Sequence, residues 1–476
     1  MTNFADRILR PETNDYPVRN LTDIDFYKFS MGQFIFQNYK GVRVRFGLIN
    51  REQKIPLARI VDEAELRAAL DHICTLKIRR TDLSTLRGMD VYGQNMFSND
   101  YLAFLADLRL PTYDLKRVGD QYELFFECEW AEVTLWETIA MAAIMELYYR
   151  ALMRKLPKRE LENMYGMAAN KLYRKLLRIK QHGGIRLADF GQRRRHSFLW
   201  QRYAIDMAKD VLGEQFTGTS NTYMAFGADL NPIGTNAHEL PMVVTALKMI
   251  EALKGGLSRE DIIPLVRGAQ YTVLDQWEQM YGSGLRIILP DTYGSKQFFA
   301  NMSADQARRI AFDWRGIRQD SGDPVAECWM FINWLKSQGV ANPKKAGKVC
   351  IFSDGLDVKL DGASGEPDII ELYETFKDEI NTPFGWGTNF TNDFKGCLSC
   401  ADDLVPGLED LGLKWKDVFK GFSLVCKVIA VIYDGIKVGA VKLSNNILKA
   451  TGAKEDVAEY IPIYGEDGRI EQKVNV

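Results

Sequence analysis

Cysteine, net charge and long apolar runs are all scarce in this chain, and each shortage excludes a class of protein. The 476 residues include seven cysteines, odd in number and scattered, which is untypical of a disulfide framework and favours reduced thiols in the cytoplasm. Cys397 and Cys400 form one CxxC pair, but no second pair completes a zinc site. Loop or packing roles are therefore expected for both.

Charge and hydrophobicity exclude two further classes. Lys and Arg total 61 against 63 Asp and Glu, a formal net charge of −2, so the basic surplus of a nucleic-acid or anionic-membrane binder is missing. The most apolar stretch, residues 133–153, is interrupted by Glu137, Glu146 and Arg150, which indicates a buried helix rather than a membrane span. The first fifteen residues have no apolar core, so no signal peptide is expected.

The remaining composition is that of a folded, multidomain protein. Hydrophobic residues make up 46% of the chain and charged residues 26%, which is ordinary for a globular protein. At roughly 150 residues per domain, the length predicts about three parts. We expect an α+β domain over residues 1–150, a catalytic α/β domain over 151–400 and a β-rich segment over 401–476 that packs with the first domain.

Both ends of the chain have antiparallel character. Residues 42–49 and 122–128 resemble strands within the first domain. Near the other end, the turn Asp434-Gly435 separates 422–432 from 436–443, which predicts a β-hairpin. A second turn is expected at 465–468.

The middle of the chain alternates short apolar strands with helices. The expected strands are 285–289, 316–319, 349–352 and 383–385, and the expected helices include 324–337 and 368–380. Another helix over 197–212 would place Leu199, Tyr203, Met207 and Val211 on one face. Such alternation is typical of a parallel sheet, either barrel or open, which binds ligands at the C-terminal ends of its strands.

Six glycine-rich polar segments each follow an expected strand and precede a helix. They are residues 189–195, 217–221, 234–239, 318–323, 353–357 and 385–389. Each alone is a weak signal because Gly and Asp also form ordinary turns, but six in one register predict a binding rim.

The residue types in this rim suit phosphate and sugar. Glycines let backbone N–H groups approach a phosphate, and the helix that follows favours negative charge. The carboxylate pairs Asp320/Asp323 and Asp354/Asp357 suit ribose hydroxyls or Mg²⁺. Arg318 and the arginines at 193–195 supply permanent planar charge. The segments therefore predict a site for a phosphorylated sugar and a second small anion.

The ordered motifs DFGQRRR, FTGTSN, GTNAHE, RQDSGDP, FSDGLD and FGWGT, with TDIDFYK near the start, resemble the nicotinate phosphoribosyltransferase family. The resemblance spans residues from about 20 to 445. It implies an α/β fold, an irregular open barrel of the type II phosphoribosyltransferase kind, with an α+β domain built from both ends of the chain. It also implies cytoplasmic, Mg²⁺-dependent transfer of phosphoribosyl from phosphoribosyl pyrophosphate to nicotinate in NAD salvage, with ATP as co-substrate.

His238 is the candidate nucleophile. Without the resemblance, its position before an expected helix indicates a helix-capping or packed histidine. A neutral imidazole can, however, accept a phosphoryl group near pH 7. The resemblance places the histidine that ATP phosphorylates in its motif. His196 is a rival, since the neighbouring arginines would lower its pKa.

Two aromatic residues, Tyr27 and Phe190, are expected to sandwich the pyridine ring, with core packing as the alternative. In related nicotinamide-using enzymes the matching tyrosine comes from a neighbouring subunit, so the resemblance implies a possible homodimer with shared sites. Ser220 stands where those enzymes carry an aspartate. A serine hydroxyl can donate to the carboxylate of nicotinate, helped by Arg318, whereas an aspartate would repel it.

The resemblance implies the remaining contacts. Arg193 would bind substrate, with solvated surface charge as its alternative, and one of Arg194 and Arg195 is expected to be such a surface charge. Asp320, the expected catalytic residue, and Asp354, Gly355 and Asp357 would contact ribose and Mg²⁺-linked phosphate. Gly385, Gly387 and Thr388 would bind the 5′-phosphate. No direct metal ligand is assigned, and Lys427 and Trp386 have no assigned role.

Three alternatives stay open. A nicotinamide phosphoribosyltransferase is opposed by Ser220. A quinolinate phosphoribosyltransferase would be shorter and would need cations for two carboxylates. A non-catalytic sensor of pyridine nucleotides is opposed by the retention of His238, Asp320 and Asp354.

Overall fold

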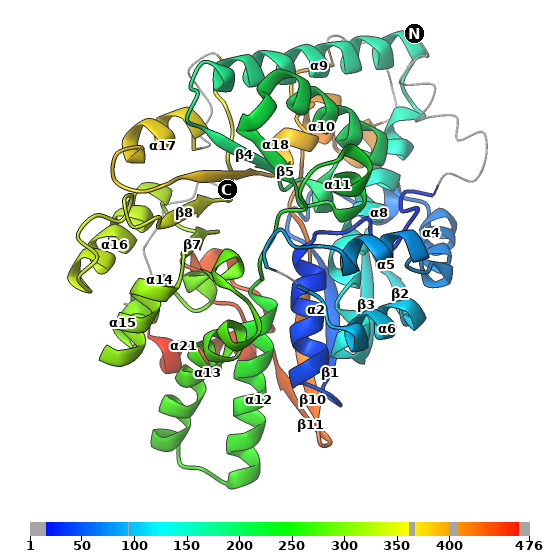
Figure 1. The fold of residues 1–476 in the computed structure, drawn as a ribbon. Coiled ribbons are helices and arrows are strands. Elements are labelled where there is room, and N and C mark those ends of the chain that lie inside the picture. The colour runs from blue at the N-terminus through cyan, green and yellow to red at the C-terminus, as the bar shows by residue number, and fades with distance from the viewer. Residues whose placement is uncertain (1–15, 94, 361–366, 399–407, 466–476) are drawn as a thin grey trace.

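Two sheets organise residues 16–93, 95–360, 367–398 and 408–465, which are the residues described by the computed structural model (Figure 1). One sheet is antiparallel, with strand order β11-β10-β1-β3-β2. The other is parallel, with order β5-β4-β9-β8-β7-β6. The expected mixture of an α+β part and an α/β part is confirmed.

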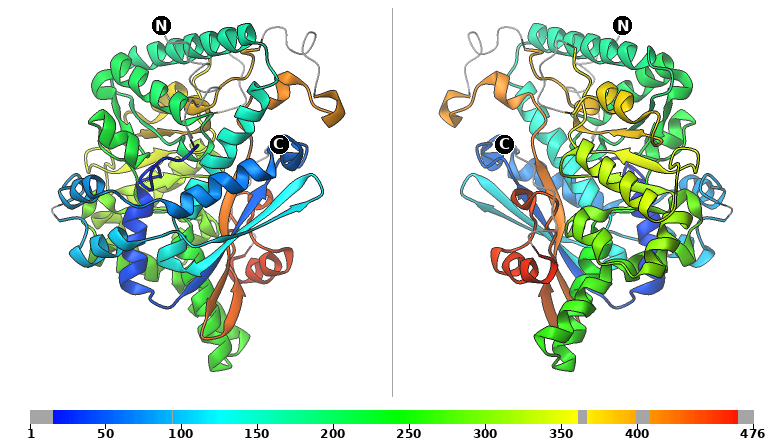
Figure 2. Two further views of the ribbon diagram at one scale, coloured as in Figure 1. Left: turned by 90° about the vertical axis from the view of Figure 1, so that its right-hand side faces the viewer. Right: turned by 90° about the vertical axis from the view of Figure 1, so that its left-hand side faces the viewer.

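The antiparallel sheet joins the two ends of the chain. Its strands are β1 (Arg43–Asn50), β2 (Tyr113–Val118), β3 (Gln121–Glu129), β10 (Leu424–Tyr433) and β11 (Ile436–Gly439). β1 lies in the centre, where Val44 pairs with Cys128 of β3 and with Val431 of β10. The hairpin of β10 and β11 therefore packs with the N-terminal strands as expected, and Figure 2 shows the two groups side by side.

The parallel sheet carries the alternation that the sequence predicts. Its strands are β4 (Arg186–Asp189), β5 (Phe216–Thr219), β6 (Ile287–Ile288), β7 (Gly316–Gln319), β8 (Val349–Phe352) and β9 (Pro383–Trp386). Asp or Gly follows within two residues of β7, β8 and β9, so β7 and β8 lie where expected and β9 begins where expected. The strand expected at 285–289 is only Ile287–Ile288. Among the described residues the sheet is open between β5 and β6, in keeping with an irregular barrel.

Helices cover both sheets. Those of the first half are α2 (Tyr27–Asn38), α3 (Leu57–Ile60), α4 (Glu63–Thr75), α5 (Arg80–Arg87), α6 (Asn99–Asp107), α7 (Trp130–Val133), α8 (Trp136–Met153), α9 (Lys158–Lys180), α10 (Phe198–Leu212) and α11 (Thr222–Ala228). Those of the second half are α12 (Glu239–Gly255), α13 (Arg259–Met280), α14 (Ser295–Ala300), α15 (Ala304–Asp313), α16 (Pro324–Ser337), α17 (Ile369–Phe376), α18 (Thr388–Thr391), α20 (Trp415–Val418) and α21 (Lys454–Tyr464).

The apolar stretch at 133–153 is a buried helix, as predicted, because nearly every residue of α8 is enclosed. Within the described part of the chain, no helix combines the length and apolarity that a membrane crossing needs.

Three local expectations need comment. The helix expected over 197–212 is α10, and Leu199, Tyr203, Met207 and Val211 are half-buried and pack against the core. Its fully buried face is a neighbouring one, with Phe198, Gln201, Ile205, Ala208 and Leu212. The C-terminal segment is less β-rich than expected, since helix α21 follows the hairpin. Cys400 and most of the expected turn at 465–468 lie outside the described residues, and the domain boundaries at 150 and 400 stay predictions.

Candidate active site

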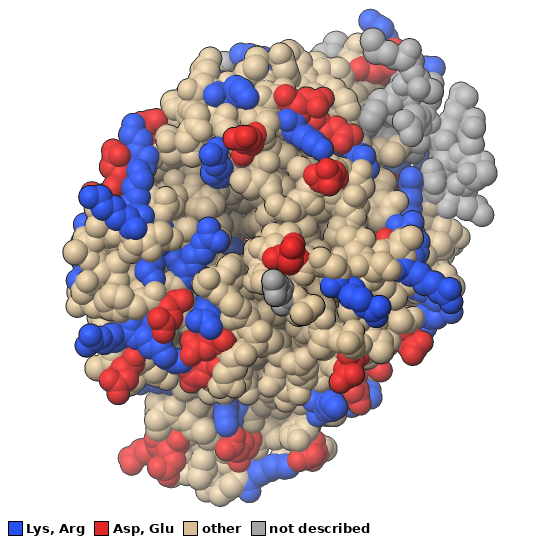
Figure 3. Space-filling model, in the orientation of Figure 1, with Lys and Arg blue, Asp and Glu red and all other residues tan. Residues whose placement is uncertain are grey.

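A pocket of about 850 Å³ lies between the two sheets. Eleven of the twelve predicted site residues line it: Tyr27, Phe190, Arg193, Ser220, His238, Arg318, Asp320, Asp354, Gly355, Gly387 and Thr388. The pocket also reaches residues at the N-terminal ends of strands, such as Arg186 and Pro383, so it is not confined to the C-terminal rim. Figure 3 shows one face of the molecule hollowed near its middle, with Lys and Arg side chains on one side of the hollow.

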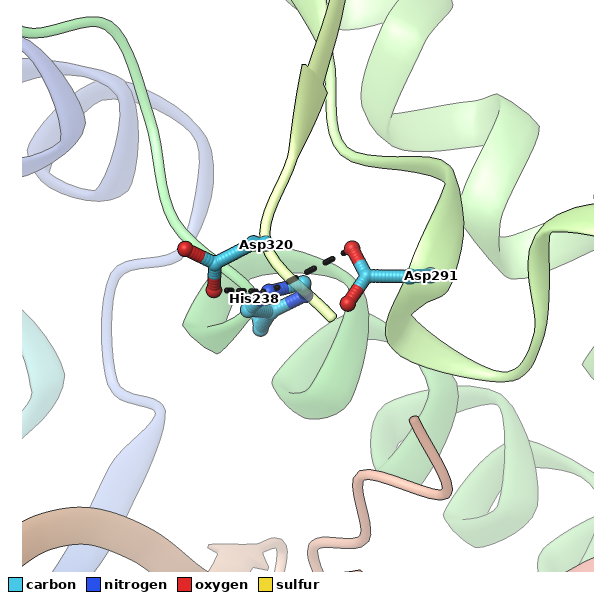
Figure 4. A group of neighbouring side chains, drawn as sticks. All are labelled: His238, Asp291 and Asp320. Atoms are coloured by element: carbon cyan, nitrogen blue, oxygen red, sulfur yellow. Dashed lines mark hydrogen bonds and ion pairs between the residues drawn. The ribbon is translucent and has the colours of Figure 1, made fainter. Parts of the chain in front are cut away.

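His238 precedes α12 directly, and its imidazole is almost fully buried. Its Nδ1 lies 2.9 Å from the hydroxyl of Thr292, and its Nε2 lies 3.0 Å from Asp320 Oδ2. Asp291 Oδ1 is 3.6 Å from the same Nε2, so the ring lies between two carboxyl groups (Figure 4). One segment expectation fails here, because the segment 234–239 follows an isolated bridge at Pro232 and not a strand.

Lys442, which sequence reasoning missed, completes this cluster. Its Nζ lies 2.9 Å from His238 Nε2, 3.2 Å from Asp291 Oδ2 and 3.9 Å from Asp320 Oδ2. The lysine follows the hairpin, and Leu443 and Ser444 behind it both donate backbone N–H groups to the carbonyl of Thr292. A lysine within the apolar run Val441-Lys442-Leu443 was the signal that could have found it.

The charges of the cluster set its protonation. Burial lowers the pKa of His238, and the nearby Lys442 ammonium lowers it further, against the raising effect of Asp291 and Asp320. Although burial alone would raise the pKa of Asp320, Arg318 and Lys442 hold it well below its usual range. The arrangement therefore keeps the imidazole neutral beside an ionised carboxylate, which is the state a nucleophilic histidine needs.

The same cluster is the one group of described residues with the spacing of a metal site. One ligand atom from each of His238, Asp291 and Asp320 lies within 4.8 Å of the others. The Lys442 ammonium, however, already contacts the His238 and Asp291 ligand atoms. A cation held by all three residues does not fit while Lys442 stays. Asp320, with 28% of its side chain exposed, can still face a Mg²⁺ that arrives on a diphosphate.

Tyr27 and Phe190 both line the pocket, and charged groups surround them. Arg193 lies 5.9 Å from the centre of the Tyr27 ring and 3.2 Å from Asp25 Oδ2. The Tyr27 hydroxyl is buried and has no hydrogen-bond partner among the described residues, which is typical of a position that a ligand completes. Tyr27 reaches the pocket of its own chain.

Ser220 lines the pocket, but its hydroxyl already has a partner within the chain. Its hydroxyl donates to Asp25 Oδ1 at 2.6 Å, so it is not free to donate to a ligand carboxylate. Burial raises the pKa of Asp25, against the lowering effect of Arg193. A carboxyl group therefore lies at this end of the pocket despite the serine, as Asp25, and Arg193 is the cation that pairs with it.

Gly385 is the one predicted site residue that does not line the pocket, and its role towards a phosphate stays a prediction. A Cβ at this glycine would lie 2.3 Å from the Phe190 ring, so the glycine makes room for that ring and does not line the pocket. Trp386, the next residue of β9, is fully buried and packs against Phe390. Because successive side chains of a strand point to opposite faces, Trp386 can be buried although it lies next to the loop that lines the pocket.

The basic segment after β4 divides into three environments. Arg193 faces the pocket, and Arg194 lines it while donating to the carbonyl of Leu424. Arg195 is fully buried and forms an ion pair with Asp23. Neither Arg194 nor Arg195 is a solvated surface charge, so that expectation was wrong.

His196 is a core residue and not a rival nucleophile. It is fully buried, stacks on Phe394 and hydrogen-bonds to the Tyr165 hydroxyl at 2.9 Å. Burial lowers its pKa to about 3. The lowered pKa was expected, but its cause is burial and not the neighbouring arginines.

Two of the paired carboxylates lie outside the pocket. Asp323 caps α16 by accepting hydrogen bonds from two backbone N–H groups. Asp357 forms an ion pair with Lys175 and does not line the pocket. Asp354 does line it, at 3.1 Å from Lys449 Nζ, and Gly355 beside it has a φ of +61°, which favours glycine.

Lys427 also lines the pocket, at 2.7 Å from the buried Glu137. Glu137 further binds Lys28, which in turn binds Glu239 next to His238. Although burial alone would raise the pKa of Glu137, Lys28 and Lys427 keep it ionised. This network ties the antiparallel sheet to the residue that follows the candidate nucleophile.

Glu327 of α16 provides a prediction about stability. It is buried, and Asn445 donates to it at 3.1 Å. Burial raises its pKa to about 8, far above the usual 4.5, so the folded protein holds a proton that the unfolded chain releases between these two values. Stability should therefore fall as pH rises through this window, by on the order of a few kcal/mol. Glu327→Gln should raise the melting temperature near pH 8.5 and change it less near pH 5. Equal shifts in thermal unfolding at both pH values would contradict this.

Comparison with known proteins identifies the same family that the sequence motifs resemble. Residues 185–421 match the model of the nicotinate phosphoribosyltransferase family, and residues 22–145 match that of the family's N-terminal domain. The fold is similar to a nicotinate phosphoribosyltransferase from Vibrio cholerae (TM-score 0.74, 25% identity, 95% of this chain and 94% of that chain). It is also similar to one from Porphyromonas gingivalis (TM-score 0.74, 23% identity, 94% and 100%).

Proposed function

The chain belongs to the nicotinate phosphoribosyltransferase family, and from this membership we infer how its pocket transfers phosphoribosyl from phosphoribosyl pyrophosphate to nicotinate. The ring nitrogen of nicotinate attacks the anomeric carbon, pyrophosphate leaves, and nicotinate mononucleotide is formed in NAD biosynthesis. Because that nitrogen is already nucleophilic, the enzyme needs no general base. Its work is to orient two anions and to stabilise the leaving group.

We place the pyridine ring between Tyr27 and Phe190, with its carboxylate towards Arg193 and Arg318. The Arg318 Nε is buried without a hydrogen-bond partner among the described residues; the nearest anion is Asp320, whose Oδ1 lies 3.8 Å away, beyond hydrogen-bond distance. The arginine also lines the pocket. An anionic carboxylate satisfies that donor, whereas a neutral amide does so less well. The unpartnered Arg318 Nε, rather than the Ser220 hydroxyl, is the observation that supports a preference for nicotinate over nicotinamide.

We place the phosphorylated sugar at the loops after β8 and β9. Gly387 and Thr388 offer the 5′-phosphate backbone N–H groups and a hydroxyl, and Asp354 offers a carboxylate to the ribose hydroxyls. Arg194 and Lys449 add positive charge to the same pocket. A Mg²⁺ ion that arrives with pyrophosphate would face Asp320 and would neutralise charge on the leaving group.

We propose that ATP phosphorylates His238. A ring nitrogen would attack the γ-phosphorus, an N–P bond would form, and ADP would leave. The neutral imidazole, set by burial and Lys442, supports this step. Later hydrolysis of the phosphohistidine would return the enzyme to its first state. A cytoplasmic location and a homodimer with shared sites stay predictions.

Gly385→Ala tests the position of the ring. The added methyl group would meet Phe190, so we expect the Michaelis constant for nicotinate to rise roughly tenfold or more, with His238 phosphorylation unchanged. Steady-state kinetics would measure this. Gly166→Ala in α9 is the matched control, since its methyl group would meet nothing within 4 Å. An unchanged Michaelis constant in Gly385→Ala would remove the ring from this place.

The experiment for the function itself is a competition. Enzyme, Mg²⁺ and phosphoribosyl pyrophosphate are incubated with equal nicotinate and nicotinamide, and the two mononucleotides are separated by chromatography. We expect nicotinate mononucleotide to dominate. Equal use of both pyridines would contradict the role given to Arg318, and product from neither would favour the sensor alternative.

A further inference from the structure

A buried ion cluster lies behind the pocket, outside the site described above. Lys175 of α9 has 3% of its side chain exposed, and its Nζ lies 2.5 Å from Asp357 Oδ1 and 2.7 Å from Asp393 Oδ2. The same Nζ lies 5.8 Å from the centre of the Trp386 ring. A buried lysine with two carboxylate partners costs free energy to desolvate, and stability alone is weak grounds for its presence.

The two carboxylates belong to the two loops assigned to the phosphorylated sugar. Asp357 lies in the loop after β8, three residues beyond Asp354, which lines the pocket with Gly355. Asp393 follows α18, whose first residues Thr388 and Asn389 also line the pocket. Lys175 therefore bonds to both loops at once, from the side away from the ligand.

The sheet itself joins these loops weakly. β8 pairs with β9 through one residue pair, Phe352 with Phe384, and an isolated bridge joins Val349 to Asn381 just before β9, at the end away from the loops. β7–β8 and β4–β9, by contrast, each pair through four residue pairs. Beyond the Phe352–Phe384 pair, the amide of Asn389 donates to the carbonyl of Leu356 at 3.0 Å. The spacing of the two loops thus depends on side chains, and Lys175 is the buried cation that bridges their carboxylates.

We propose that Lys175 is a positioning residue that ties the loop after β8 to the loop after β9 and thereby sets the affinity for the phosphorylated substrate. The proposal rests on the proposed function, since it takes phosphoribosyl pyrophosphate as the ligand of these loops. Lys175 touches neither the nicotinate end nor the His238 cluster. Its loss should therefore act on one substrate only.

Lys175→Met in the full-length protein is the first test. We expect the Michaelis constant for phosphoribosyl pyrophosphate to rise about tenfold or more, with kcat and the Michaelis constant for nicotinate within about twofold of the wild type. Arg174→Met is the matched control, because Arg174 is an exposed cation one residue away on the same helix. A Lys175→Met enzyme with the wild-type Michaelis constant would overturn the proposal.

A second variant separates positioning from folding. Lys175→Met alone leaves the half-buried Asp357 without its cation and leaves Asp393 with only Lys171, whose Nζ lies 2.5 Å from Asp393 Oδ1. Lys175→Met/Asp357→Asn/Asp393→Asn removes the charges of all three residues and frees the more exposed Lys171 to face solvent. We expect this triple variant to regain the wild-type melting temperature and to keep the raised Michaelis constant, and it decides the question if the single variant does not fold. Recovery of both values together would reduce Lys175 to a structural role. A wild-type enzyme that does not use phosphoribosyl pyrophosphate would instead contradict the proposed function.

Discussion

A His238→Ala enzyme is expected to lose all labelling by γ-labelled ATP and all stimulation of turnover by ATP. The imidazole is the buried, neutral nucleophile of the pocket, and alanine leaves no atom to accept the phosphoryl group. Slow ATP-independent transfer should remain, because the residues that orient both substrates are intact. Acid-labile label on the protein and product formation with and without ATP are the two measurements.

His182→Ala is the matched control for this experiment. His182 pairs with Glu374 at the surface and does not line the pocket, so its loss should leave labelling and stimulation unchanged. Wild-type labelling in His238→Ala would place the phosphoryl group on another residue and remove His238 from the mechanism.

A Lys442→Met enzyme should show a shifted pH profile. Burial and the Lys442 charge lower the pKa of His238, while Asp291 and Asp320 raise it. Without the lysine only burial opposes the two carboxylates, so the pKa of His238 rises and a larger fraction of the imidazole is protonated near neutral pH. Phosphorylation needs the neutral ring, so its rate should fall at pH 7 by roughly tenfold for each unit by which the pKa exceeds 7, and should recover in alkaline buffer.

The rate of His238 labelling between pH 6 and 9 measures this shift. Lys437→Met serves as the control, since Lys437 is an exposed lysine on β11, a few residues before Lys442. A Lys442→Met profile that fell equally at every pH would indicate lost structure or lost phosphate binding, and not the proposed control of protonation.

Sequence reasoning predicted the parallel strands and the loops beside them because both depend on local signals. Short apolar runs bounded by Gly and Asp placed β7 and β8 correctly, and the polar residues after them line the pocket. The motif around His238 predicted the candidate nucleophile through its resemblance to a family, and the structure places that histidine in the pocket. All of these signals lie within short stretches of sequence and do not depend on how distant segments pack.

The errors arose where distant segments meet. Lys442 approaches His238 from 204 residues away, and Ser220 gives its hydroxyl to Asp25 from 195 residues away. The buried face of α10 was missed because it includes the polar Gln201, which accepts from Arg195 and Asn221 and donates to Asp189. Apolar periodicity cannot find a face that is buried by a hydrogen-bond network. By contrast, the two-residue period of a strand could have predicted that Gly385 and Trp386 face opposite sides of the sheet.

The most direct measurement of the whole account is the stoichiometry of one reaction. Enzyme, Mg²⁺, phosphoribosyl pyrophosphate, nicotinate and γ-labelled ATP are mixed, and nicotinate mononucleotide, labelled protein and free labelled phosphate are followed together. We predict that label first appears on His238 and then leaves as inorganic phosphate in step with product. Product that accumulates while the protein carries no label, or while the label stays bound, would contradict coupling through His238.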